Sequence, residues 1–67
     1  MNFYYVVQIE SECRYVDDSD HRPYTDYWLA VGAAMEEAQS VGRNMRVVKR
    51  AVAPDDEPVF EIGGQAR

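Results

Sequence analysis

The chain has 67 residues, 46% of them hydrophobic and 12% aromatic, and a formal net charge of −5 at pH 7. This length fits one domain and leaves no room for a second. Because Cys13 is the only cysteine and His21 the only histidine, the sequence excludes an internal disulfide and argues against a structural zinc site of four nitrogen or sulfur ligands.

The first residues also bear on the compartment. Met1–Tyr5 lacks the basic start and the long apolar run of a signal peptide. No stretch approaches the roughly 20 apolar residues that a membrane-spanning helix needs. A lone thiol without an export signal is typical of a reducing compartment. We therefore expect a cytoplasmic protein that makes no membrane contact.

Residues 3–10 alternate in polarity in the way that is typical of a half-buried strand. One face of this strand would consist of Phe3, Tyr5, Val7 and Ile9. The alternation continues through Ser11, Cys13 and Tyr15, so residues 3–16 form either one long bent strand or two short strands broken near Ser11.

A polar segment, Asp17–Pro23, predicts a loop before a helix over about residues 26–41. Thr25 or Asp26 can accept a hydrogen bond from a free amide of the first turn, and Gly42 follows the last periodic residue, where a left-handed cap is expected. Apolar residues recur at helical spacing and predict the face that packs on the sheet. This stripe consists of Tyr27, Val31, Ala34, Met35, Ala38 and Val41.

The last third of the chain predicts a hairpin. Met45–Val52 reads as a second strand, Pro54–Pro58 as a turn and Val59–Ile62 as a short third strand, followed by a frayed tail over 63–67. The expected fold is a single α+β domain over 1–67. It would have a small, three- to four-stranded, mainly antiparallel sheet with one α-helix packed on one face.

No motif in the chain predicts catalysis or a cofactor. The acidic loop fails the calcium-loop pattern, because counting from Asp18 places Arg22 and Pro23 at the fifth and sixth positions. Cys13 and His21 have no helix start or glycine-rich loop nearby that would activate a thiolate. The sequence therefore predicts no catalytic residue, no metal site and no cofactor.

The aromatic residues outnumber what one helix on a small sheet can bury. Seven of the eight fall within the first 28 residues. We expect Tyr4 and Tyr24 to be the most exposed, whereas Trp28 lies one position from the stripe and would pack partly. Exposed tyrosine and tryptophan are typical of the residues that anchor protein interfaces.

The acidic residues favour a binding function. Together with the surplus aromatics they predict a non-enzymatic protein-binding module, whose partner is a larger and partly basic protein. Rows of carboxylates can imitate a nucleic-acid backbone, so such a module could inhibit its partner by occupying a basic groove. Small phage proteins that block host defence nucleases, including anti-CRISPR inhibitors, are similar to this chain in size and acidity, although no motif is shared. The predicted partner-binding residues are Asp17, Asp18, Asp20, Tyr24, Trp28, Glu36, Glu37, Asp55, Asp56 and Glu57.

Two alternatives remain open. In one, the chain is a homodimeric structural or accessory module, in which a sheet edge or the helix face completes the core of a second copy. In the other, a basic segment binds nucleic acid weakly through Arg43, Arg46, Lys49 and Arg50. The excess of acids elsewhere makes direct nucleic-acid binding the less favoured function. The basic residues have a simpler explanation as partners of Glu10, Glu12 or Glu61 across the sheet.

Overall fold

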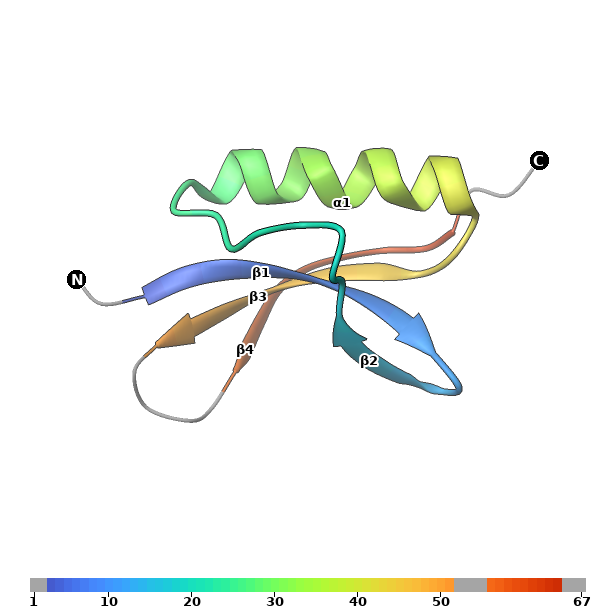
Figure 1. Ribbon diagram of the computed structural model, residues 1–67, viewed down its shortest axis with the longest axis horizontal. Helices are drawn as coiled ribbons and strands as arrows, with labels where there is room; N and C mark the ends of the chain where they lie inside the picture. Colours follow the sequence, from blue (N-terminus) through green and yellow to red (C-terminus); the bar gives the residue numbers. More distant parts are fainter. Residues whose placement is uncertain (1–2, 52–55, 65–67) are drawn as a thin grey trace.

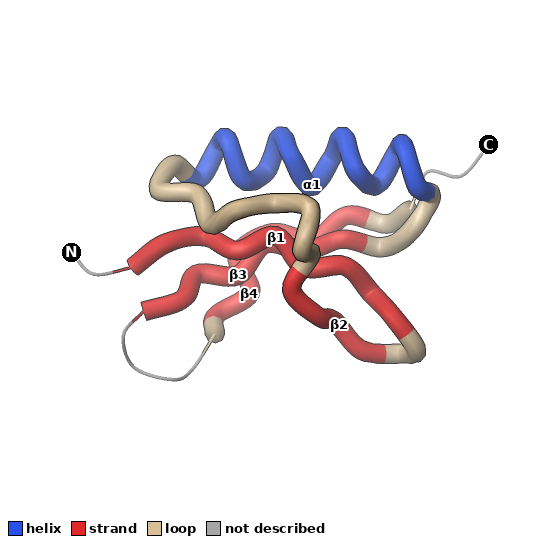
Figure 2. Tube along the Cα trace, viewed as in Figure 1, coloured by secondary structure: helices blue, strands red, loops and turns tan. Residues whose placement is uncertain are grey.

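A computed structural model describes residues 3–51 and 56–64, and it shows one sheet with one helix packed on it (Figures 1 and 2). The elements in chain order are β1 (Phe3–Ser11), β2 (Arg14–Asp17), α1 (Tyr27–Val41), β3 (Met45–Ala51) and β4 (Glu57–Ile62). The strand order is β2-β1-β3-β4, and every neighbouring pair is antiparallel. The α+β fold expected from the sequence is confirmed.

Residues 3–16 form two strands joined by a tight turn, so the second of the two sequence alternatives is correct. Glu12 and Cys13 make this turn in the left-handed region, with φ of 54° and 69°. A two-residue hairpin turn needs such angles because they match the twist of the strands, and glycine or asparagine usually supplies them. Neither residue type occurs at these two positions, which is why the turn could not be predicted.

The predicted helix is confirmed, together with both of its caps. The Asp26 side chain accepts hydrogen bonds from the amides of Trp28 and Leu29 at 2.8 and 3.3 Å. At the other end Gly42 has φ of 69°, and its amide donates to the carbonyl of Ala38. A residue with a Cβ would be strained in this left-handed conformation, so glycine fixes the end of α1.

Small residues bring α1 close to the sheet. Ala30, Ala34 and Ala38 are fully buried, and they pack with Val7, Met45 and Val47 into one hydrophobic cluster. The predicted stripe was therefore partly wrong. Met35 and Val41, expected against the sheet, are 41% and 45% exposed, whereas Ala30, which was not in the stripe, is buried. The physical reason is that a row of alanines at intervals of four lets the helix axis approach the sheet, and the larger residues then lie beside the contact.

The hairpin of β3 and β4 is confirmed, with a different start for β4. This strand begins at Glu57 rather than Val59, and a bulge lies between Val47 and Val48 of β3. Pro58 is tolerated within β4 because this strand is an edge of the sheet. Residues 52–55, which include Val52 and the first two residues of the predicted turn, Pro54 and Asp55, lie outside the described residues. So do 65–67 of the predicted tail, whereas the Gly64 amide donates to Asn44 Oδ1 at 2.8 Å.

Candidate functional site

The outer side of α1 exposes large apolar side chains. Trp28 is 74% exposed and Leu29 62%, and Met35 lies two turns further along. The packing of Ala30, Ala34 and Ala38 on the sheet sets this orientation. Tyr27 faces the sheet, where its hydroxyl donates to the Val59 carbonyl, so Trp28 must point about 100° away. We call Trp28, Leu29, Gly32 and Met35 the helix surface.

Gly32 lies in the middle of the helix surface, one turn from Trp28 and one from Met35. A Cβ added at Gly32 would meet nothing within 4 Å, so no contact among the described residues requires a glycine there. Glycine inside a helix costs about 0.5–1 kcal/mol relative to alanine. The glycine leaves a notch between two larger apolar side chains, which suits the close approach of another molecule.

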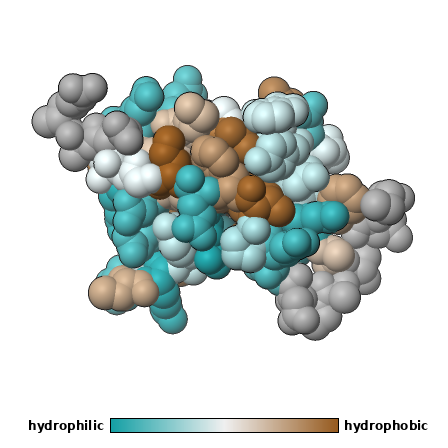
Figure 3. All heavy atoms as spheres, turned by 180° about the vertical axis from the view of Figure 1, so that it is seen from behind, coloured by the Kyte–Doolittle hydropathy of each residue, from teal (hydrophilic) through white to brown (hydrophobic). Residues whose placement is uncertain are grey.

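The surroundings of the helix surface are acidic. Residues 26–41 contain Asp26, Glu36 and Glu37 and no lysine or arginine. Asp26 and Glu36 are exposed. The rear view in Figure 3 shows hydrophobic residues gathered near the middle of the face that is turned away from the viewer in Figure 1. Half-buried Val59, Phe60 and Ile62 of β4 pack against the core.

A second group of polar side chains joins the loop before α1 to the helix. His21 Nε2 lies 3.3 Å from Glu37 Oε1 and 3.9 Å from Asp18 Oδ2. The other ring nitrogen, Nδ1, lies 3.2 Å from the hydroxyl of Tyr24. Tyr24 itself is anchored, because it exchanges backbone hydrogen bonds of 2.7 and 2.8 Å with Tyr5 of β1. Tyr24 is therefore half-buried, and the expectation that it is among the most exposed aromatics was wrong.

Asp18 is the most enclosed charged residue of this group, with 7% of its surface exposed. Its Oδ1 accepts a hydrogen bond from the Asp20 amide at 3.0 Å, which closes the turn of the loop. Its Oδ2 is buried and has no hydrogen-bond partner among the described residues. An unsatisfied buried acceptor costs about 1–3 kcal/mol, and more when it is charged. Although the loop consists of polar residues, one of its carboxylates is therefore buried.

The open face of the sheet, away from α1, carries a charge network that joins β2, β3 and Asp56, the residue before β4. Arg50 of β3 donates to both oxygens of Asp17 at 2.9 and 3.0 Å, and to both oxygens of Asp56 at 2.8 Å. These hydrogen bonds from the Arg50 guanidinium hold the pKa of both carboxyl groups below the ordinary value of 3.8. Asp17 and Asp56 therefore stay ionised and share the single positive charge of Arg50.

The other three residues of the basic segment, Arg43, Arg46 and Lys49, also have partners in the chain. Arg46 donates to Gln8 at 2.8 Å and lies over the ring of Tyr15, while Lys49 lies over the ring of Phe3 on the other side of the sheet. Arg43 donates to the backbone carbonyl of Glu10. Burial, followed by the charges of nearby carboxylates, raises the pKa of the Tyr15 hydroxyl. The basic segment therefore has partners within the protein, but the predicted carboxylate partners were wrong. Arg43 meets Glu10 only at its backbone carbonyl, and Arg46 and Arg50 bind Gln8, Asp17 and Asp56.

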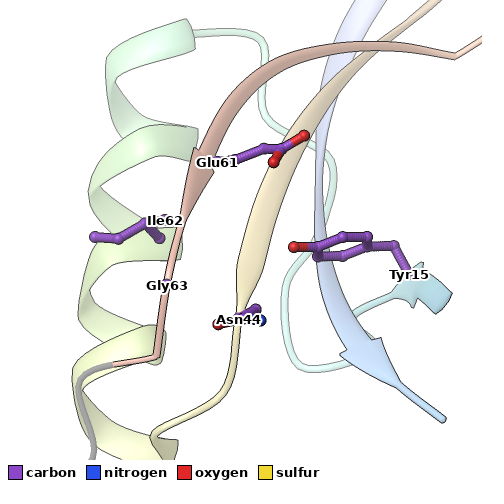
Figure 4. Close-up of a pocket in the computed structure, with 5 residues that line it drawn as sticks. All are labelled: Tyr15, Asn44, Glu61, Ile62 and Gly63. Atoms are coloured by element: carbon purple, nitrogen blue, oxygen red, sulfur yellow. The ribbon is translucent and has the colours of Figure 1, made fainter. Parts of the chain in front are cut away.

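A hollow of about 210 Å³ lies at one end of the open face (Figure 4). The hydroxyl of Tyr15 and the carboxylate of Glu61 point toward one another across it, whereas Ile62 points to the opposite side, toward the helix. Asn44 and Gly63 complete the lining. Small-molecule sites usually measure about 300–1,000 Å³, so this hollow is small for a ligand pocket.

The charge network makes a prediction about acid stability. Folding lowers the pKa of both aspartates. Their contribution to the free energy of unfolding is therefore present above about pH 4, and it is lost as the pH falls through the pKa values of the folded state. We expect Arg50→Gln to lower the free energy of unfolding at pH 7 by only about 1 kcal/mol, because these ion pairs are partly exposed to water. The difference between the urea midpoints of the wild type and the variant should become smaller at pH 2.5.

Arg14→Gln provides the control, because Arg14 is exposed on β2. Its unfolding midpoint should follow that of the wild type at both pH values. If the midpoint of Arg50→Gln differed from that of the wild type by the same amount at pH 7 and pH 2.5, Arg50 would act by packing and not through the two carboxylates.

The structure distributes the predicted partner-binding residues over several separate places. Trp28 and Glu36 lie on or beside the helix surface. Asp18, Tyr24 and Glu37 belong, with His21, to the group that joins the loop to the helix, which we call the loop–helix group, and the side chain of Asp20 is exposed outside it. Asp17 and Asp56 pair with Arg50 on the open face, and Glu57 is exposed at the start of β4. Asp55 lies outside the described residues. Leu29, Gly32 and Met35 were missed, because the sequence placed Met35 on the buried stripe.

The comparisons with protein families, curated proteins and solved structures found no match to this chain. Within residues 3–51 and 56–64, no helix is long and apolar enough to cross a membrane. Evidence for the function therefore comes from the surfaces of the protein itself.

Proposed function

We propose that the chain is a non-enzymatic protein-binding module that docks on a larger, partly basic protein through the helix surface. The observation that carries this proposal is the 74% exposure of Trp28, beside Leu29 at 62% and Met35 at 41%. Tryptophan is enriched among the residues that dominate binding energy at interfaces. Its ring is also held in place, because it packs edge-on against Tyr27 with 4.9 Å between the ring centroids.

The charge around the helix surface determines the kind of partner. Since residues 26–41 contain three acids and no base, a partner with an apolar pocket edged by lysine or arginine would be complementary. A basic groove of this kind is also a surface on which nucleic acid binds. Occupying it would make the chain an inhibitor, with Asp26 and Glu36 meeting the basic rim.

Self-association is the alternative, and two features weigh against it. A second copy placed on the helix surface would add only acidic residues from its own helix, so no ion pair could form between the two helices. The sheet edges are also poor templates for a second copy, because β2 has four residues and β4 contains Pro58. A heterologous partner therefore fits the helix surface better than a second copy does.

The test compares capture by variants that keep the fold. Tagged protein is incubated with lysate of the native host, and the partner is identified, purified and titrated against each variant. We expect Trp28→Ala to weaken binding by more than about 30-fold, the loss of an anchor residue worth about 2 kcal/mol. Glu36→Lys should weaken binding most at low salt, because it reverses a charge at the rim.

Tyr4→Ala is the matched control, since Tyr4 is an aromatic residue, 37% exposed, on the open face of the sheet. It should bind the partner as the wild type does. Equal affinity for Trp28→Ala and the wild type would exclude the helix surface. A chain that sediments as a dimer, and becomes a monomer on Trp28→Ala, would instead establish the homodimeric module.

A further inference from the structure

Among the described residues, one group of three side chains is arranged so that it could hold a metal ion. Asp18, His21 and Glu37 each offer one ligand atom, and these atoms all lie within 4.8 Å of one another. We propose that Asp18 Oδ2, His21 Nε2 and Glu37 Oε1 bind a divalent transition-metal ion of the Zn²⁺ type. The bound ion would fasten the loop before α1 to the middle of the helix.

The strongest reason is the unpartnered oxygen of Asp18. This residue is 7% exposed, and its Oδ1 is already used by the Asp20 amide. Its Oδ2 is buried, without a hydrogen-bond partner in the part of the chain that the structure describes, and lies 3.9 Å from His21 Nε2. Buried carboxylates in proteins are normally paired or coordinate metals. A cation between Asp18, His21 and Glu37 would give this oxygen its partner.

The distances suit a tetrahedral ion. Zinc binds nitrogen and oxygen at about 2.0–2.2 Å, which places neighbouring ligand atoms about 3.3–3.6 Å apart. His21 Nε2 lies 3.3 Å from Glu37 Oε1 and 3.9 Å from Asp18 Oδ2. The first distance already fits, and the second requires a shift of a few tenths of an ångström. The carboxylate oxygens of Asp18 and Glu37, which lie within 4.8 Å of one another, would have to approach by up to about 1 Å when the ion binds.

His21 is also oriented as a ligand. With Nε2 free to bind the ion, Nδ1 carries the proton and donates it to the Tyr24 hydroxyl, 3.2 Å away. Histidine ligands of metals are usually fixed by such a second hydrogen bond. Tyr24 can serve as this partner because its backbone is bonded to β1 on both sides.

The ligand set decides the class of ion. One imidazole nitrogen with two carboxylate oxygens suits Zn²⁺ or Co²⁺, whereas Ca²⁺ and Mg²⁺ prefer oxygen ligands alone. The side chains of His21 and Glu37 are 18% and 20% exposed, so water can reach the fourth position. A chain with a single cysteine can form no internal disulfide, and a metal is another way to cross-link a small domain.

The test uses protein without a histidine tag, titrated with Zn²⁺ and, separately, with Co²⁺. At one hundred times the dissociation constant, Zn²⁺ should raise the melting temperature by roughly 10–20 °C. Because His21 is the only histidine, its imidazole ¹⁵N resonances report the site directly. Zn²⁺ should shift the Nε2 resonance strongly and leave Nδ1 protonated. Co²⁺ should produce the intense visible absorption of a tetrahedral complex.

The variants Asp18→Asn, His21→Gln and Glu37→Gln each remove one ligand. Loss of a residue that hydrogen-bonds a metal ligand usually weakens metal binding by roughly 10–100-fold. Loss of a ligand itself should weaken Zn²⁺ binding by more than that. The asparagine of the first variant keeps an oxygen for the Asp20 amide, so the turn is preserved. Asp20→Asn and Glu36→Gln are the matched controls, since both acids are exposed and lie outside the group. Both controls should bind Zn²⁺ as the wild type does.

Unchanged His21 resonances at saturating Zn²⁺ would overturn the proposal, even if a ligand variant failed to fold. Equal loss of affinity in Asp20→Asn and Asp18→Asn would also overturn it, because the ion would then be held by general negative charge. A rise in melting temperature with Ca²⁺ or Mg²⁺ but not with Zn²⁺ would contradict the proposed class of ion. None of these results depends on the partner-binding function, which is measured through Trp28.

Discussion

We expect Met45→Ala to cost about 2–5 kcal/mol of unfolding free energy, the usual range for a buried methionine. Met45 is fully buried, has one of the largest enclosed side chains of the protein, and lies in the cluster between α1 and the sheet. A domain of this length has a total stability of about 3–10 kcal/mol. The variant should therefore be partly unfolded at 37 °C, as circular dichroism in a urea titration would show.

The same chemical change at an exposed position is the control. Met35 is 41% exposed on the helix surface, so Met35→Ala should change the unfolding free energy by less than about 0.5 kcal/mol. Equal destabilisation by the two substitutions would mean that α1 packs on the sheet through the opposite side, and the described core would then be wrong.

Ala34→Leu should be destabilising by about 1–3 kcal/mol although it adds hydrophobic surface, because overfilling a packed core displaces its elements. Ala34 is fully buried between Ala30 and Ala38, in the row that brings α1 close to the sheet. A leucine there forces the helix outward and opens the contact with β1 and β3. Thermal unfolding followed by circular dichroism at 222 nm measures this loss directly.

Gln39→Leu adds a leucine to an exposed position of the same helix and serves as the control. Its melting temperature should remain close to that of the wild type. If Ala34→Leu raised the melting temperature, the space between helix and sheet would have to be larger than the burial of Ala30, Ala34 and Ala38 implies.

The loop–helix group and the helix surface share α1 but use different sides of it. Glu37 points to the loop that contains His21, whereas Trp28 and Met35 point to solvent. A metal ion at Glu37 would hold the middle of the helix, and a partner at Trp28 would contact its first turns. We therefore expect Zn²⁺ to stabilise the fold and to leave the residues that contact the partner unchanged.

Local patterns in the sequence determined the elements. Alternation predicted β1, a valine-rich run predicted β3, and helical spacing predicted α1. Asp26 and Gly42 indicated the ends of the helix, because caps act through hydrogen bonds within a few residues. The turn at Glu12 and Cys13 was undecided, since neither residue is typical of its left-handed angles. These features depend on short stretches of chain, so one sequence is enough to read most of them.

Only the tertiary structure determined which side chains are exposed and which acids have partners. The sequence placed Met35 on the buried stripe. In the structure the helix packs on the sheet through Ala30, Ala34 and Ala38, and this leaves Met35 exposed. The acids looked alike in sequence, yet one is buried, two are paired with Arg50, and Glu37 meets His21 from 16 residues away. Such contacts join residues that are distant in the chain, so no local pattern records them, and the fold alone brings them together.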